Sequence, residues 1–155
     1  IIVVDIHDHK LEQARAFGAT HTLNAKREDV LAGVLRITGG KGVDHAIESA
    51  GQRPSMEQAF GVVRSGGGKA ILVGNLPAGQ PISIDPFQLI CGKEIVGCWG
   101  GQTQPAVDLP RYADLFLEGK LKLAELVSHR FRLDQVNDAL EALERGEVAR
   151  AILEF

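Results

Sequence analysis

An acidic residue, Asp5, directly follows an apolar run at the start of the chain, "IIVVD". If this run is a buried parallel strand, a carboxylate at its carboxyl end can accept hydrogen bonds from both ribose hydroxyls of an adenosine. The same carboxylate repels a 2′-phosphate, which favours NAD over NADP. Asp5 could instead cap the helix expected from about residue 8. Lys10, five residues later, is either a second ribose ligand or a solvated lysine.

Two later segments end in small residues, "ESAG" at 48–51 and "LVGN" at 72–75. Each follows a strand-like run, and ligands of open α/β sheets bind at the carboxyl ends of such strands. Small residues there allow a flat ring or a ribose to approach the backbone. Alternatively, these small residues only mark the change from strand to loop and bind nothing.

A lone cation, Arg150, lies in the apolar segment "VARAILEF", which we expect to be the final strand. A charge in an apolar setting needs a partner, and either a pyrophosphate or a nearby acid would serve. The "HDH" at 7–9 has no third ligand nearby, so no metal site is predicted there. We predict no catalytic residue within this chain.

The composition excludes several classes of protein. The 155 residues suit one domain of ordinary size, and a net charge of −3 gives no electrostatic case for binding nucleic acid or an anionic membrane. No apolar run approaches the roughly 20 residues of a membrane span. The first residues lack the features of a signal peptide. Two isolated cysteines, Cys91 and Cys98, favour a reducing compartment, and hence the cytoplasm.

Strand-like and helix-like segments alternate along the chain, which predicts βαβ units and a parallel sheet. In the strand-like "GVDHAIES" we expect Val43, Ala46 and Ile47 to point inward. Pro54 suits the first turn of the next helix. After Trp99 the helices become amphipathic and charged, which suggests that a second structural unit begins there.

Taken together, these segments resemble the zinc-type, medium-chain alcohol dehydrogenases. The matching segments are "VVDIHDHKLEQARAFGATHTLN", "GVDHAIESAG", "GGGKAILVGN", "KEIVGCWGG" and "GEVARAILEF", in the order of that family. The resemblance covers essentially all 155 residues and is nearest to bacterial members related to the glutathione-dependent formaldehyde dehydrogenases.

The resemblance implies specific cofactor contacts. Asp5 and Lys10 would hold the adenosine ribose, and Arg150 the pyrophosphate. The other implied NAD contacts fall into an adenine group of Ala50, Gly51 and Gln52, and a nicotinamide group of Val73, Gly74 and Asn75 with Cys98 and Trp99 opposite.

The resemblance also implies the organisation of the molecule. Residues 1–98 would form a Rossmann-like, doubly wound α/β domain with a mostly parallel sheet, which binds the dinucleotide. Residues 99–155 would return to the catalytic domain. The strand at 93–99 would pair across a two-fold axis in a homodimer or homotetramer. The substrate would be a small alcohol or aldehyde, oxidised or reduced by hydride transfer with NAD.

Several family features have no counterpart in these residues. The zinc ligands, the first strand and the glycine-rich turn are absent, so zinc in the intact enzyme would be held by residues outside this chain. We therefore expect the C-terminal part of a longer enzyme, inactive and poorly stable alone. In the strand order 3-2-1-4-5-6 the first strand is central, so its loss would expose two strand edges.

Three alternatives remain open. A zinc-free, quinone-reductase-like member would share the fold, although Asp5 argues against NADPH. A methyltransferase-like domain also holds a ribose through an acid after its second strand. A non-catalytic nucleotide-binding module would have to close its sheet without the central strand.

Overall fold

A computed structural model describes every residue from Ile1 to Phe155. The chain divides into two compact units, Ile1–Thr103 and Gln104–Phe155. Strands and helices alternate in both units, and every strand pairs in parallel with its neighbour. The predicted α/β class is therefore confirmed.

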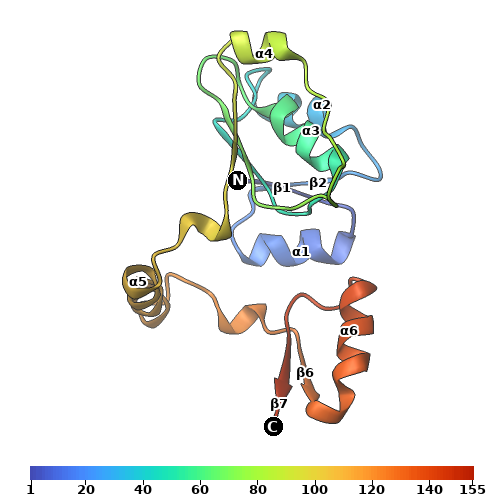
Figure 1. Ribbon diagram of the computed structural model, residues 1–155, viewed down its shortest axis with the longest axis vertical. Helices are drawn as coiled ribbons and strands as arrows, with labels where there is room; N and C mark the ends of the chain where they lie inside the picture. Colours follow the sequence, from blue (N-terminus) through green and yellow to red (C-terminus); the bar gives the residue numbers. More distant parts are fainter. The chain divides into compact units, whose positions relative to one another are not determined.

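The first unit contains two parallel sheets, β1-β2 and β3-β4-β5. In Figure 1, α1 lies on one side of the β1-β2 pair, and α2 and α3 lie on the other. Its elements are β1 (Ile2–Asp5), α1 (Asp8–Ala16), β2 (His21–Asn24), α2 (Val30–Ile37), β3 (His45–Glu48), α3 (Arg53–Val62), β4 (Lys69–Leu72), α4 (Pro86–Ile90), β5 (Glu94–Gly97) and the 3₁₀ turn η1 (Gly100–Gln102).

Local sequence signals explain where these helices begin. The side chain of Asp29 caps α2 by accepting the backbone N–H of Ala32 at 2.7 Å. Pro54 lies in the first turn of α3, as predicted, where its missing N–H costs no hydrogen bond. α1 ends before Gly18, whose φ of +100° suits glycine far better than other residues.

Two clusters of apolar side chains form the core of the first unit. The first joins β2 and α2 to the end of α3, and the second joins α3 to β4. Their buried members are Leu23, Val30, Val34 and Val62 in the first, and Ala59, Phe60, Val63 and Ala70 in the second. Val43 and Ala46 pack against both clusters, as their predicted inward positions require.

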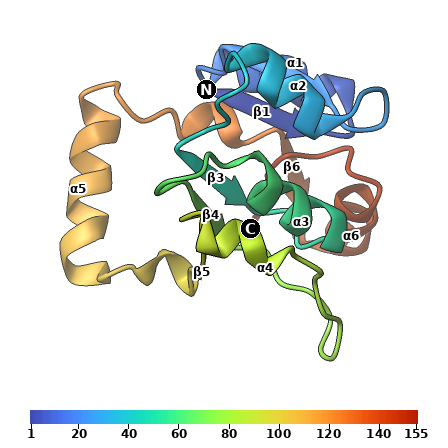
Figure 2. The same cartoon turned by 90° about the horizontal axis from the view of Figure 1, so that it is seen from above.

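The strands β1 and β3 do not pair with each other. In Figure 2, β1 lies with α1 and α2, while β3 and β4 lie beside α3. A cavity of about 840 Å³ is lined by residues of both β1 and β3. Ile47, which we expected to be buried, lines this cavity and is 70% exposed. The prediction for Ile47 is wrong because a strand's inward position is buried only where another element covers it.

The second unit is built around a parallel βαβ motif in which α6 joins β6 to β7. Ala139 and Ala142 of α6 are buried, as is Val148. The elements are α5 (Pro105–Leu117), η2 (Ala124–Leu126), β6 (His129–Arg132), η3 (Leu133–Gln135), α6 (Val136–Glu144) and β7 (Ala151–Glu154). Across the whole chain, none of the helices has the length and apolar character needed to cross a membrane.

Candidate functional site

Polar residues and glycines gather at the carboxyl ends of the strands of the first unit. In the register of the two strands, Asp5 at the end of β1 lies opposite Asn24 at the end of β2. In the other sheet, Glu48, Leu72 and Gly97 occupy the matching last positions of β3, β4 and β5. Because ligands of open parallel sheets bind beyond this edge, the loops that leave these strands form the candidate site.

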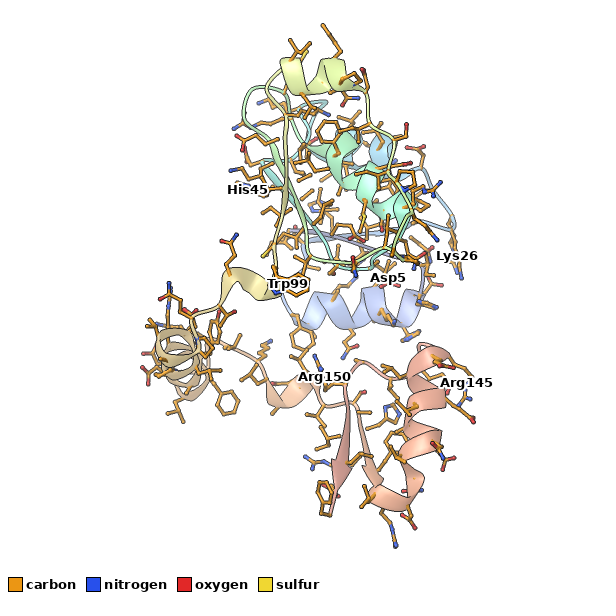
Figure 3. The ribbon with its side chains drawn as sticks, viewed as in Figure 1. Asp5, Lys26, His45, Trp99, Arg145 and Arg150 are labelled. Carbon is orange, nitrogen blue, oxygen red and sulfur yellow. The ribbon has the colours of Figure 1, made fainter.

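The Asp5 carboxylate is half-buried, with 31% of its side chain exposed. Its Oδ1 accepts the backbone N–H of His7 at 2.9 Å and lies 3.1 Å from Nδ1 of the His7 ring. Its Oδ2 has no partner within the chain. One oxygen therefore supports the start of α1, and the other remains able to accept a hydroxyl. Asp5 is labelled in Figure 3. Lys10 is half-buried on α1 and makes no ion pair with Asp5.

A second polar group anchors the end of β2. Asn24, only 9% exposed, donates from Nδ2 to Oδ1 of Asp8 at 2.6 Å. Its Oδ1 accepts the backbone N–H of Lys26 at 2.9 Å. The Arg27 guanidinium pairs with the other oxygen of Asp8. Asp8 is thus occupied by neutral and cationic donors, which leaves Asp5 as the acid with a free oxygen at this end of the sheet.

The loops after β3 and β4 touch each other backbone to backbone. Gly51 has a φ of +68°, and a Cβ there would lie 2.8 Å from the carbonyl oxygen of Asn75. A Cβ on Gly74 would collide with the backbone nitrogen of Gly51. The close approach requires glycine at both positions. The two glycines therefore fix the relative position of the loops after β3 and β4.

Glu48 is the most deeply buried acid of the chain, at 4% exposure. Its Oε1 accepts hydrogen bonds from the backbone N–H groups of Ala50 (2.9 Å) and Gly51 (2.8 Å) and from Oγ of Ser55 (2.6 Å). Its Oε2 is buried and has no hydrogen-bond partner. No basic side chain forms an ion pair with it.

A cleft of about 850 Å³ opens between the loops after β4 and β5. This volume is within the range typical of small-molecule and cofactor sites. Met56 of α3 contributes to the wall, and Trp99 on the rim is 93% exposed (Figure 3). The cleft brings together five of the residues singled out from the sequence, namely Val73, Gly74, Asn75, Cys98 and Trp99.

The remaining predicted residues lie elsewhere. Ala50 lines the cavity between β1 and β3. Gly51 is buried in the crossing, and Gln52 is the exposed residue before α3. Arg150 belongs to the second unit.

The environment predicted for Arg150 is wrong. Arg150 is exposed and lies at a bend just before β7, rather than in an apolar strand. Its backbone is held by Ser128, whose Oγ accepts the N–H of Arg150 at 3.2 Å. Its side chain makes no ion pair with a local acid. The apolar pattern of "VARAILEF" misled the prediction because the strand begins only at Ala151.

No group of three or more histidine, cysteine, aspartate or glutamate side chains is arranged to hold a metal ion. Both cysteines are free thiols, with Cys91 exposed and Cys98 half-buried. The residues described here therefore hold no candidate zinc site.

Sequence reasoning missed Glu48 as a separate element of the site. The signal that singled out Asp5, an acid after an apolar strand, is also present in "AIES". Asn24 is likewise a polar residue at the end of a strand, β2. The lining residues Met56 and Ile82 carry no comparable signal because they reach the cleft only through the fold.

Comparison with known proteins finds a matching family and several relatives of this chain. A family model described as "Zinc-binding dehydrogenase" matches residues 1–118. The S-(hydroxymethyl)glutathione dehydrogenase of Aspergillus oryzae is 36% identical over 157 residues, which cover 100% of this chain and 41% of the relative. The alcohol dehydrogenase class-3 of Caenorhabditis elegans is 32% identical, with coverage of 100% and 42%.

Solved structures of dehydrogenases are also similar to this chain. The benzyl alcohol dehydrogenase of Acinetobacter calcoaceticus superposes with a TM-score of 0.94 at 31% identity, covering 100% of this chain and 42% of that one. An alcohol dehydrogenase zinc-binding domain protein of Burkholderia ambifaria gives 0.93 at 33%, covering 100% and 41%. These neighbours confirm the predicted Rossmann-like, doubly wound fold. The chain spans about two-fifths of the length of the relatives it matches.

Proposed function

The chain belongs to the zinc-binding dehydrogenase family, and from that premise we propose that it is the NAD-binding part of an NAD-dependent alcohol dehydrogenase. The proposed reaction is hydride transfer between an alcohol or aldehyde and NAD. The observation that carries the proposal is the half-exposed carboxylate of Asp5, which has one oxygen without a partner at the carboxyl end of a parallel strand. This is the position from which an acid can bind an adenosine ribose.

The adenosine half of the cofactor is assigned to the end of β1 and the loop after β3. The free Oδ2 of Asp5 would accept the ribose hydroxyls, and the Lys10 side chain, which has no ion-pair partner, would reach the same sugar. Ala50 and Gln52, which are exposed, and the buried Gly51 between them would line the adenine side. The negative charge of Asp5 would disfavour the 2′-phosphate of NADP.

The nicotinamide half is assigned to the cleft after β4 and β5. Val73, Gly74 and Asn75 form one wall, with Cys98 and Trp99 as the other. Gly74 lets the loop after β4 pack directly against Gly51, which sets the position of this wall. Arg150, exposed and without an ion-pair partner, would bind the pyrophosphate.

These residues bind and orient the cofactor, and we assign none of them a catalytic role. NAD supplies the hydride acceptor of the reaction when it is bound. The cleft walls would hold the ring and exclude water from its face. Residues 1–155 provide no ligand set for the zinc that the family name implies, so we derive no step through zinc from this chain.

Substrate, assembly and location are proposed at the level that the family supports. The relatives are named for S-(hydroxymethyl)glutathione, benzyl alcohol and other alcohols, so a small alcohol or aldehyde is the proposed substrate class. β5 pairs only with β4, and its outer edge, within 93–99, could pair with a second copy in a homodimer or homotetramer. The two free thiols support a cytoplasmic location.

The division of labour along the chain is also a proposal. We assign residues 1–98 to cofactor binding and residues 99–155 to a segment that returns to the catalytic domain. The amphipathic α5, in which no residue is buried, supports this assignment because its apolar side chains need a covering surface.

Fluorescence titration of the intact protein with NADH and NADPH tests the proposal. We expect saturable NADH binding, NADPH binding at least about tenfold weaker, and loss of most of that discrimination in Asp5→Ser, because this removes the charge that meets the 2′-phosphate. Absence of NADH binding contradicts the proposal. Binding of S-adenosylmethionine instead would favour the methyltransferase-like alternative.

A further inference from the structure

Glu48 is an unusual residue because its carboxylate is nearly inaccessible and has no cationic partner. Removing a carboxylate from water is costly unless hydrogen bonds replace those of the solvent. Three donors meet one of its oxygens, and none meets the other. The cofactor roles assigned above do not use this side chain, although it lies between the two groups of assigned residues.

We propose that Glu48 is a positioning residue for cofactor binding, which holds the adenine-side loop and the nicotinamide-side loop in register. This inference rests on the proposed function. Oε1 of Glu48 fixes the N–H groups of Ala50 and Gly51 and the hydroxyl of Ser55 at the start of α3. The carboxylate thus determines the path of the loop assigned to adenine.

The main chain of the same residue fixes the other loop. The carbonyl oxygen of Glu48 accepts the N–H groups of Val73 at 2.8 Å and Gly74 at 3.0 Å. A Cβ on Gly74 would lie 2.5 Å from Oε2, so the carboxylate and the Gly74 backbone are in direct contact. A shift of the side chain would therefore displace Val73 and Gly74, which line the cleft assigned to nicotinamide.

The unpartnered Oε2 makes the inference specific. Only Oε1 accepts hydrogen bonds, and Oε2 contributes packing against Gly74, so a side chain of the same size with one correctly placed oxygen should be sufficient. Glutamine provides that oxygen and has the size of glutamate. Alanine removes all three hydrogen bonds, and aspartate keeps the charge but is one methylene shorter.

The test compares Glu48→Ala, Glu48→Gln and Glu48→Asp with the parent in the intact protein. Three quantities are measured, namely the dissociation constant for NADH, the kcat and KM for NAD, and the melting temperature. In Glu48→Ala we expect a dissociation constant and a KM raised by at least about tenfold, and a kcat within about threefold of the parent. Glu48→Gln should lie within about threefold of the parent throughout.

Val34→Ala is the matched control for stability. Val34 is a buried residue of the first core cluster, 3% exposed, and has no assigned role in cofactor binding. The Val34→Ala substitution should lower the melting temperature while leaving the NADH affinity of the folded protein unchanged.

The outcomes separate this inference from the proposed function. A parent that does not bind NADH overturns both. If the parent binds NADH and folded Glu48→Ala binds it equally well, Glu48 has only a structural role and the inference alone fails. Should Glu48→Ala not fold, Glu48→Asp decides: weakened NADH binding with a near-parental kcat supports the inference, and unchanged binding overturns it. Failure of Glu48→Gln to restore affinity likewise rejects the single-oxygen account.

Discussion

The ends of β1 and β3 carry the same type of residue at the same position and use it in opposite ways. Asp5 closes β1 with 31% of its side chain exposed and one oxygen free. Glu48 closes β3 at 4% exposure, with three donors on one oxygen. The first is suited to a ligand from outside, and the second to holding the protein's own backbone.

The difference arises from the loop that follows each strand. After Asp5 the chain enters α1 within three residues, and only the His7 backbone and ring turn back toward the acid. After Glu48 the positive φ of Gly51 turns the loop over the carboxylate, so that two successive N–H groups point at it. An acid at the end of a strand is thus available to a ligand only when the next loop leaves it uncovered.

The largest effect is expected from Gly51→Ala. Alanine is strained at a φ of +68°, and its Cβ would lie 2.8 Å from the carbonyl oxygen of Asn75. We expect the free energy of unfolding to fall by about 3 kcal/mol, from backbone strain together with overpacking. The loop would leave Glu48, and NADH affinity would fall as well. Urea unfolding and NADH titration measure the two effects.

Gly18→Ala provides the control for that variant. Gly18 also has a positive φ, +100°, but nothing lies within 4 Å of the position of a Cβ. Gly18→Ala should lower the free energy of unfolding only by the cost of the backbone strain, about 1 kcal/mol. Equal destabilisation by the two substitutions would mean that the contact between the two loops contributes nothing.

Asp5→Asn is expected to have the second largest effect, and on binding rather than on folding. The amide keeps the size of the side chain but loses the charge, so hydrogen bonds to ribose hydroxyls weaken by about 1.5–2 kcal/mol and the dissociation constant for NADH rises about tenfold to thirtyfold. The melting temperature should change little because Asp5 is half-exposed. A large loss of stability with unchanged NADH affinity would place Asp5 in the same class as Glu48 and remove the contrast.

The sequence was sufficient to predict the alternation of strands and helices, and the acid that ends β1. These follow from local patterns, namely the apolar runs and Pro54 in the first turn of α3. It was insufficient for Ile47, whose burial depends on distant elements, and for Glu48, whose burial depends on the path of the loop that follows it. Ile47 is 70% exposed beside the cavity between β1 and β3, whereas Glu48 is covered by a glycine turn and by Ser55.

Ser55→Ala should have a smaller effect on the buried acid. The Ser55 hydroxyl lies 2.6 Å from Oε1 of Glu48 and 2.8 Å from the carbonyl oxygen of Gln52. Its removal leaves Glu48 with the two backbone donors, so we expect a loss of about 1 kcal/mol in the free energy of unfolding. Ser65→Ala, at an exposed turn, is the control and should be neutral. If Ser55→Ala is equally neutral, the hydroxyl is not part of the support for the carboxylate.

The smallest effect is expected from a third acid, at the opposite end of β3. Asp44 precedes the strand and has 72% of its side chain exposed, and its Oδ1 accepts Nε–H of Arg64 at 2.6 Å. The hydrogen bond from Arg64, and then the charge of that guanidinium, hold the pKa of Asp44 below its ordinary value.

Because the folded state lowers the Asp44 pKa, the ion pair stabilises the protein above the unfolded-state pKa and is lost as the pH falls through the folded-state pKa. Asp44→Asn should therefore lower the melting temperature by no more than about 1 °C at neutral pH, and the difference from the parent should disappear as the pH falls through the lowered pKa of Asp44. NADH affinity should not change. An Asp44→Asn variant that weakens NADH binding as much as Asp5→Asn would show that charge anywhere on these strands matters, rather than an uncovered carboxylate at their carboxyl ends.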